Sequence, residues 1–263
     1  MDSPLFPREA MATPSLEHPT LTAGISGTGW EAFDRIYCIT LADRLDRRQS
    51  ARSEFARVGL ASRVEFIVVE RHPTDSEQGI FDSHMRCLRE GLAAGACTIV
   101  VFEDDILFAN FSFETLSDSV VFMKSDVEWD LFFLGCFVKS CRKTQFRSVV
   151  RIRYQCAAHA YVISRRFAEI LITRPWQGIA YDDVIRSISS PHIYTAYPAF
   201  AFQNDSSSDN FRMTSIDRNR RLLGGMRRLQ RWNEFSHRHA IALVMLHVAV
   251  ILLIILLLLI GRT

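Results

Sequence analysis

An uninterrupted apolar segment near the C-terminus constrains the fold of this 263-residue chain more than any other feature. Residues 240–260 contain no charged side chain and a single histidine, His247. A helix of about 20 apolar residues spans the ~30 Å hydrocarbon core of a bilayer. A helix buried in a globular core is the alternative, but residues 252–260 are apolar on every side. We therefore expect residues 240–260 to form a transmembrane helix.

Basic residues are divided unevenly between the two sides of this segment. Seven arginines lie between residues 218 and 239, and only Arg262 follows the apolar run. Because Lys and Arg collect on the cytoplasmic side of a membrane, we expect a single-pass C-terminal anchor with the rest of the chain in the cytoplasm. Residues 218–239 predict a juxtamembrane segment that contacts anionic membrane lipid. A solvated linker whose arginines only set the orientation is the alternative.

The remaining residues divide into a leader and one domain. Residues 1–30 hold four of the eight prolines among many Ser, Thr and Gly residues, a composition typical of a disordered leader. Residues 31–217 are long enough for one domain with a sizeable core. Residues 1–217 carry 28 acidic and 23 basic side chains, so nucleic acid is not an expected partner.

Short apolar runs rich in β-formers alternate with segments of helical spacing through this domain. The expected strands are residues 36–41, 64–69, 98–102, 130–134, 158–164 and 192–197. One expected helix follows the first strand and ends near residue 58. The others cover residues 83–94, 112–124 and 165–173. This alternation predicts an α/β fold whose mostly parallel sheet is covered on both faces.

Three carboxylates, Glu103, Asp104 and Asp105, directly follow the strand expected at residues 98–102. Ligands of parallel α/β sheets bind beyond the carboxyl ends of the strands. Side chains alternate along an extended segment, so Glu103 and Asp105 share one side and Asp104 faces the other. Such a carboxylate pair suits a divalent cation, which could in turn hold a diphosphate. A solvated acidic cap on the strand is the alternative interpretation.

Other polar residues have two interpretations when each is considered alone. Asp182 and Asp183 fit either a general base or the acidic first turn of a helix. His84 fits a helix start with an incidental imidazole, and Gln203 ends an apolar run in a polar loop. The chain lacks the glycine patterns of dinucleotide-binding folds and P-loops, and it has no serine nucleophile elbow.

The order of these blocks along the chain resembles glycosyltransferase family 25. This family includes lipopolysaccharide and lipooligosaccharide galactosyltransferases and the collagen-modifying galactosyltransferases. The similarity covers about residues 33–210. The matching blocks are residues 36–48, 79–84, 101–106, 129–135, 159–164 and 181–183, followed by Gln203 with Ser206 to Ser208.

The resemblance implies a glycosyltransferase A-type fold, a divalent metal such as Mn²⁺ and a nucleotide-sugar donor such as a UDP-hexose. It implies inverting transfer of the hexose, galactose in the named relatives, to a glycan or lipid-linked acceptor. It assigns the metal to Glu103 and Asp105 and the catalytic base to Asp182 or Asp183. The residues that it assigns to the donor and metal-diphosphate pocket are Thr40, Leu41, Arg44, Arg47, Ser83, His84, Asp104 and Gln203.

Two departures from the family pattern concern the donor pocket. Thr40 stands where the family usually has Asn, and the segment between Val69 and Gly79 is shorter than expected. They leave a second hypothesis, in which a catalytically degenerate glycosyltransferase fold acts as a membrane-bound scaffold in glycan biosynthesis. A third hypothesis, a metal-dependent phosphohydrolase, needs more His or Asp ligands than the domain offers.

Overall fold

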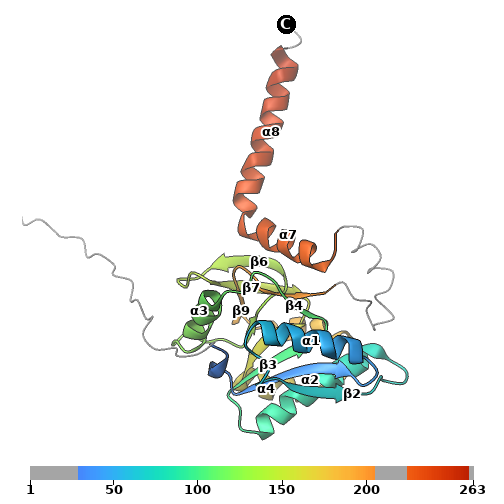
Figure 1. The fold of residues 1–263 in the computed structure, drawn as a ribbon. Helices are drawn as coiled ribbons and strands as arrows, with labels where there is room; N and C mark the ends of the chain where they lie inside the picture. Colours follow the sequence, from blue (N-terminus) through green and yellow to red (C-terminus); the bar gives the residue numbers. More distant parts are fainter. Residues whose placement is uncertain (1–28, 205–223, 261–263) are drawn as a thin grey trace, which may run out of the picture.

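The computed structural model describes residues 29–204 and 224–260. Nearly all of the expected leader, residues 1–28, lies outside the described residues, as do Ser206 to Ser208 and residues 218–223. The described chain forms an α/β body from which one long helix, α8 (Ala240–Ile260), projects (Figure 1). A single turn of 3₁₀ helix, η1 (Trp30–Ala32), opens the body.

An eight-stranded sheet forms the centre of the body. Its spatial order is β2 (Glu65–Val69), β1 (Arg35–Leu41), β3 (Thr98–Glu103), β8 (Ala160–Ser164), β5 (Leu131–Phe133), β9 (Ile193–Ala196), β7 (Val149–Cys156) and β6 (Phe137–Lys143). Strands β2, β1 and β3 pair in parallel, as do β5 and β9, whereas β8 and β7 run antiparallel to their neighbours. Six of the eight strands thus run in one direction, which confirms the expected α/β class with a mostly parallel sheet.

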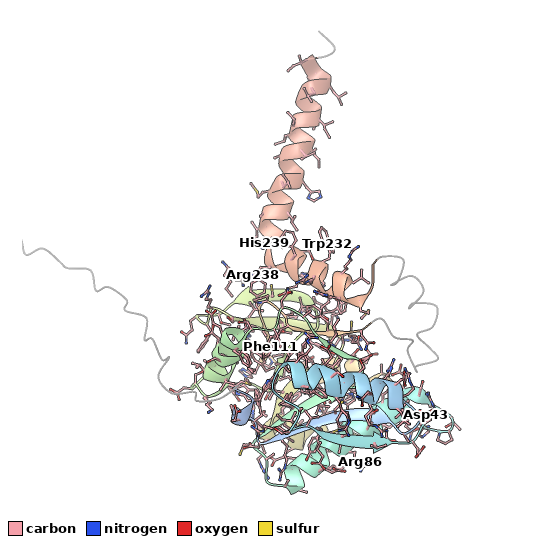
Figure 2. All side chains as sticks on the ribbon, in the orientation of Figure 1. Asp43, Arg86, Phe111, Trp232, Arg238 and His239 are labelled. Atoms are coloured by element: carbon pink, nitrogen blue, oxygen red, sulfur yellow. The ribbon has the colours of Figure 1, made fainter. Side chains whose placement is uncertain are left out.

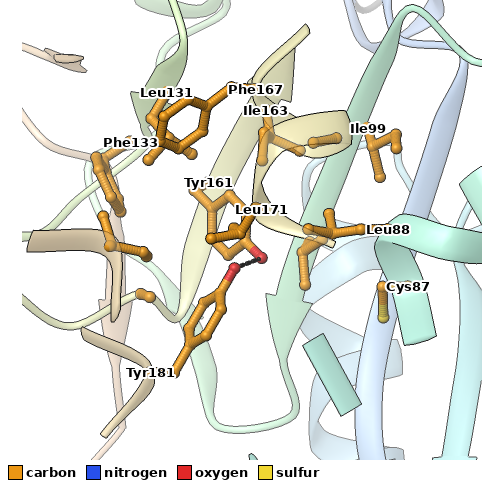
Figure 3. Close-up of a cluster of buried hydrophobic side chains, with 14 of the residues drawn as sticks. Cys87, Leu88, Ile99, Leu131, Phe133, Tyr161, Ile163, Phe167, Leu171 and Tyr181 are labelled. Atoms are coloured by element: carbon orange, nitrogen blue, oxygen red, sulfur yellow. Dashed lines mark hydrogen bonds between the residues drawn. The ribbon is translucent and has the colours of Figure 1, made fainter. Parts of the chain in front are cut away.

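Helices cover both faces of this sheet, and each face has its own apolar core. On one face, α2 (Ser76–Ala93), α4 (Arg165–Leu171) and α5 (Tyr181–Ile188) pack against the side of the sheet that carries Ile99 and Val101 (Figure 3). On the other face, α1 (Leu45–Arg57) and α3 (Phe113–Met123) pack against the side that carries Val100 and Phe102. The continuous apolar run of β3 is therefore buried on both faces, as expected for a central strand.

The strands and helices predicted from apolar runs are present with small shifts of their ends. Helix α2 begins earlier than expected because Asp75 caps it, with the carboxylate accepting a hydrogen bond of 2.9 Å from the Glu77 N–H. The prediction missed the β6–β7 hairpin and the antiparallel pair of β4 (Ile106–Phe108) with β10 (Ala201–Gln203). Along β7, buried residues alternate with exposed ones such as Arg151 and Arg153, so this strand is not a continuous apolar run.

Helix α7 (Met226–Arg238) lies on the body next to β6 and β10. The Asn233 side chain accepts a hydrogen bond from the Val138 N–H at 2.8 Å and donates one to the Val138 carbonyl at 3.0 Å. Gln230 donates to the Ala201 carbonyl at 3.0 Å. The sequence placed these residues in a juxtamembrane segment outside the domain, whereas the structure packs most of that segment against the domain as a helix.

Only His239 separates α7 from α8. Among the described residues, α8 is the one helix long and apolar enough to cross a membrane, with a mean hydropathy of 3.4. None of its most apolar stretch is buried against the body, so α8 is not a core helix.

Gly135 lies where the β5–β6 connection, β10 and α7 meet, and this gives a test of their packing. A Cβ atom at Gly135 would overlap the Ala201 carbonyl oxygen and lie 2.6 Å from Nε2 of Gln230. Gly135→Ala must therefore displace β10 or α7, and we expect the free energy of unfolding to fall by about 1–3 kcal/mol. Urea denaturation of the detergent-solubilised chain measures this loss. A change within about 0.5 kcal/mol, typical of surface substitutions, would contradict the packing described.

Candidate functional site

A cavity of about 560 Å³ opens at the carboxyl ends of three neighbouring strands, β2, β1 and β3. Its other walls come from the first half of α2, the β7–β8 connection and the start of α5. Gln203 at the end of β10 and Met226 at the start of α7 complete the lining. The cavity therefore lies where ligands of parallel α/β sheets bind.

Ten of the twelve residues singled out from the sequence line this cavity. They are Thr40, Leu41, Arg47, Ser83, His84, Glu103, Asp104, Asp105, Asp182 and Gln203. Arg44 and Asp183 are not part of the lining. Arg44 donates two hydrogen bonds of 3.0 Å to the exposed Asp46 carboxylate. The structure thus brings most of the predicted residues together, while their roles stay predictions.

The register of β1 against β3 places the ends of these two strands side by side. Ile39 is paired with Glu103, so Thr40 lies beside Asp104. The Thr40 hydroxyl donates to one Asp104 oxygen at 2.7 Å, and Arg47 donates to the other at 3.2 Å. Asp104 therefore connects β3 with β1 and α1. Thr40, the position that departs from the family pattern, makes a buried hydrogen bond in this connection.

Glu103 and Asp105 are two carboxylates whose ionised forms are disfavoured. Removal from water and the nearby Asp182 charge raise the pKa of Glu103 to about 7. Burial and the Glu103 charge raise the pKa of Asp105 to about 8. Asp105 Oδ1 is buried without a hydrogen-bond partner in the described part of the chain. Its other oxygen accepts a long, 3.5 Å hydrogen bond from the Gln203 side chain.

This pair fits a divalent cation on the chemistry of its oxygens. A cation would offset the repulsion between the two carboxylates and would give the orphaned Asp105 oxygen a partner. Within residues 29–204 and 224–260, no group of three or more His, Cys, Asp or Glu side chains is arranged to hold a metal ion. The remaining ligands would therefore be substrate oxygens and water, as is common for Mg²⁺ at phosphate sites.

His84 connects this pair to the apolar core. Burial lowers the pKa of His84 to about 3, so its imidazole is neutral and carries one N–H. Nδ1 lies 3.0 Å from the Tyr161 hydroxyl, and Nε2 lies 3.4 Å from a Glu103 oxygen. The Tyr161 hydroxyl is in turn 2.8 Å from that of Tyr181, a bond drawn in Figure 3.

One assignment of protons satisfies every member of this chain. Tyr181 donates to Tyr161, Tyr161 donates to Nδ1 of His84, and the N–H at Nε2 donates to Glu103. The Tyr181 ring also stacks on the imidazole, with ring centroids 4.0 Å apart. Neither tyrosine was among the predicted site residues, although both lie in blocks that carry the family resemblance, residues 159–164 and 181–183.

Asp182 is held in place by three hydrogen-bond donors at the start of α5. The backbone N–H groups of Ala157 and Ala158 donate at 3.1 and 3.2 Å, and the Tyr154 hydroxyl donates a third, short bond. Ala157 has a φ of 76°, a strained conformation for a residue with a Cβ, and both N–H groups point at Asp182. Asp183, in contrast, pairs with Arg186 and has a side chain 45% exposed.

The cavity also contains residues that the sequence analysis did not identify. Arg71 and His72, from the connection between β2 and α2, line the end next to β2. Met226 lines the cavity from α7, more than twenty residues after Gln203 in the chain. Met226 reaches the cavity because α7 docks on the body. No local sequence pattern relates Met226 to the acidic residues 103–105.

Comparison with known proteins finds similarity in structure only. No protein-family model and no curated protein matches the chain. A protein from STIV has 15% sequence identity and a TM-score of 0.42, with 65% of this chain and 85% of that chain covered. A glycosyltransferase involved in glycosylation of the major capsid of PBCV-1 has 8% identity and a TM-score of 0.40, with 70% and 98% covered.

A third similar structure is described as mannose-1-phosphate geranyltransferase from Thermus thermophilus. It has 8% identity and a TM-score of 0.37, with 62% of this chain and 73% of that chain covered. All three TM-scores lie below 0.5, so the functional proposal below depends on this chain's own residues.

The hydrogen bond between Tyr154 and Asp182 can be tested through stability. Tyr154→Phe removes the only side-chain donor that the described residues give Asp182, and a bond to a charged group contributes about 1.5–3 kcal/mol. We expect the free energy of unfolding at neutral pH to fall by that amount. Tyr37→Phe is the control, because within the described residues the Tyr37 hydroxyl has no hydrogen bond. Equal losses in both variants would contradict the role of this bond.

Proposed function

We propose that this protein is a membrane-tethered glycosyltransferase that moves a hexose from a nucleotide-diphosphate sugar to a glycan or lipid-linked acceptor. The observation that carries the proposal is the placement of Glu103, Asp105 and Asp182 in one cavity at the carboxyl ends of parallel strands. The three carboxylates divide into two kinds. Glu103 and Asp105 accept long hydrogen bonds of 3.4 and 3.5 Å from His84 and Gln203, whereas Asp182 accepts hydrogen bonds from three donors.

The first two carboxylates suit the donor end of the reaction. Glu103 and Asp105 would hold a divalent cation such as Mn²⁺, which supplies electrostatic stabilisation of the departing diphosphate when bound. His84 fixes the orientation of Glu103 through its N–H. Arg47 and Arg71 line the same cavity and offer cationic groups to diphosphate oxygens.

Asp182 suits the acceptor end of the reaction. As a general base it accepts the proton of the acceptor hydroxyl while that oxygen bonds to the anomeric carbon. The bond between the anomeric carbon and the diphosphate oxygen breaks with its electron pair on the diphosphate. Attack from the side opposite the leaving group inverts the anomeric centre. The position of Asp182 favours it over Asp183, whose carboxylate is paired with Arg186 outside the cavity lining.

The ordered sequence blocks support a finer assignment. They favour membership of glycosyltransferase family 25, with a UDP-hexose donor and galactose as the transferred sugar. A role in lipopolysaccharide-type glycan biosynthesis follows from the same resemblance. The Thr40 hydroxyl, at the position where the family usually has Asn, bonds to Asp104 in this chain, so the difference does not leave Asp104 without a partner on β1.

A screen of nucleotide-sugar donors, with Mn²⁺-dependent nucleotide release as the readout, tests the proposal. The wild-type chain is expected to turn over one UDP-hexose. Asp182→Asn is expected to lower kcat by about 10²–10⁴ because it removes the base, whereas the neighbouring Asp183→Asn changes kcat little. Asp105→Asn is expected to abolish Mn²⁺-dependent nucleotide release while the fold survives.

Glu114→Gln is the control for lost charge, because Glu114 is an exposed carboxylate on α3 that pairs with Arg147. Wild-type protein that binds Mn²⁺ weakly and turns over no donor would favour the scaffold hypothesis. Equal loss of activity in Asp182→Asn and Asp183→Asn would contradict the assignment of the base.

We also propose that the body lies on the cytoplasmic side of the membrane, on the basis of the arginines before α8 and the positive-inside rule. Protease added to intact spheroplasts is expected to leave residues 31–217 whole and to digest them after permeabilisation. Immunoblotting of the body measures the outcome. Digestion of the body in intact spheroplasts would place it on the opposite side.

A further inference from the structure

Helix α7 has two faces of different chemistry. Its inner face bonds to the body through Gln230, Asn233 and Glu234, the last of which accepts a hydrogen bond of 2.9 Å from the Ala199 N–H. Its outer face consists of Arg228, Arg231, Trp232 and Phe235, continued by His239, and all five are exposed. The spacing of three or four residues places them on one side of a helix.

The outer face is unusual for a surface that meets only water. Trp232 is 64% exposed and Phe235 is 46% exposed, and their ring centroids lie 6.0 Å apart. The one acidic residue of α7, Glu234, bonds to the body, so the charged groups of the outer face are arginines. Aromatic rings beside basic side chains are typical of the layer of lipid headgroups.

The position of α8 indicates which partner covers this face. Because α8 begins one residue after His239, a bilayer crossed by α8 must start at the end of α7. Helix α7 lies across the base of α8 on the top of the body (Figure 1). Figure 2 shows Trp232, Arg238 and His239 together at this base. The outer face of α7 is therefore continuous with the span.

Helix α7 also connects this membrane end with the cavity. Its first residue, Met226, lines the cavity, and its 13 residues cover about 20 Å at 1.5 Å per residue. The cavity lining also includes Arg71, whose guanidinium bonds to Asp43 at 2.7 Å. Asp43 lies at the far side of the body from Trp232 in Figure 2.

We infer that α7 is an interfacial helix whose outer face lies in the headgroup layer and holds the Met226 edge of the cavity at the membrane surface. This arrangement gives the cavity a membrane end and an end remote from the membrane. If the proposed glycosyl transfer is correct, on which this step rests, the acceptor is a lipid-linked glycan whose reacting hydroxyl lies close to the bilayer surface. The nucleotide-sugar enters from the cytoplasm.

The depth of Trp232 tests the position of α7 without any assay of activity. The full chain is reconstituted in phosphatidylcholine vesicles that contain phosphatidylglycerol and lipids brominated near the headgroup end of the acyl chain. Bromine quenches nearby tryptophan fluorescence, and the chain has four tryptophans. We expect Trp232→Phe to remove most of the quenching. Trp176→Phe, a control at a partly buried tryptophan that packs on Phe81, is expected to retain it.

Quenching that is equal in wild type and Trp232→Phe would overturn the interfacial position. The same result with Trp232 protected from aqueous acrylamide would point to a protein partner on this face, which also overturns the inference.

The acceptor class is tested by the ratio of two transfer rates in the same vesicles. One acceptor is a glycan attached to an embedded lipid, and the other is the same glycan free in solution. Helix α8 keeps the double variant in the bilayer, so the change tests only the placement of the Met226 edge. Because effective concentration falls when the geometry no longer holds two sites together, we expect Trp232→Ala with Phe235→Ala to lower the lipid-to-soluble ratio about tenfold or more. Phe113→Ala is the matched control, since Phe113 is an aromatic residue 54% exposed on α3.

An unchanged ratio in the double variant would overturn the assignment of a lipid-linked acceptor. Wild-type protein that transfers to neither acceptor from any donor would instead refute the proposed glycosyl transfer. The quenching experiment does not depend on glycosyl transfer, because it measures only where Trp232 lies.

Discussion

The parallel pairing of β1 with β3 is the constraint on which the candidate site depends. Because Ile39 is in register with Glu103, both strands end at the same edge of the sheet, and their next residues, Thr40 and Asp104, meet in a hydrogen bond. A shift of one residue would turn Asp104 to the other side and replace it with Glu103 or Asp105. The carboxylates would then exchange their donors and their exposure to the cavity.

The four carboxylates around this edge fall into two groups that differ in their hydrogen bonds. Asp104 and Asp182 receive hydrogen bonds from the chain's own donors. Glu103 and Asp105 accept long bonds from His84 and Gln203, and burial together with repulsion raises their pKa values. Such an imbalance is costly in an isolated domain, and a bound cation would offset it. The difference between the two pairs is the basis on which we propose separate metal and base roles.

Helix α7 joins the long apolar helix α8 to this edge of the sheet through hydrogen bonds to the body. A flexible linker between the body and α8 would let the body, and the cavity with it, rotate freely relative to α8. Instead, Gln230 and Asn233 bond to backbone groups of β10 and β6, and β10 also carries Gln203 to the cavity. The docking of α7 therefore fixes where α8 leaves the folded body.

The sequence by itself determined the elements whose signals are local. Continuous apolar runs predicted β1, β3 and α8, and ten of the twelve residues singled out from the sequence line the cavity, because residues at the ends of parallel strands gather at one edge. It could not separate Asp182 from Asp183, since either fits the first turn of a helix. Only the tertiary structure separates their surroundings: the β7–β8 connection presents two N–H groups to Asp182 and Tyr154 of β7 donates a third hydrogen bond, whereas Asp183 pairs with Arg186. The docking of α7 and the arrival of Met226 at the cavity were likewise decided by packing between segments far apart in the chain, which no local pattern encodes.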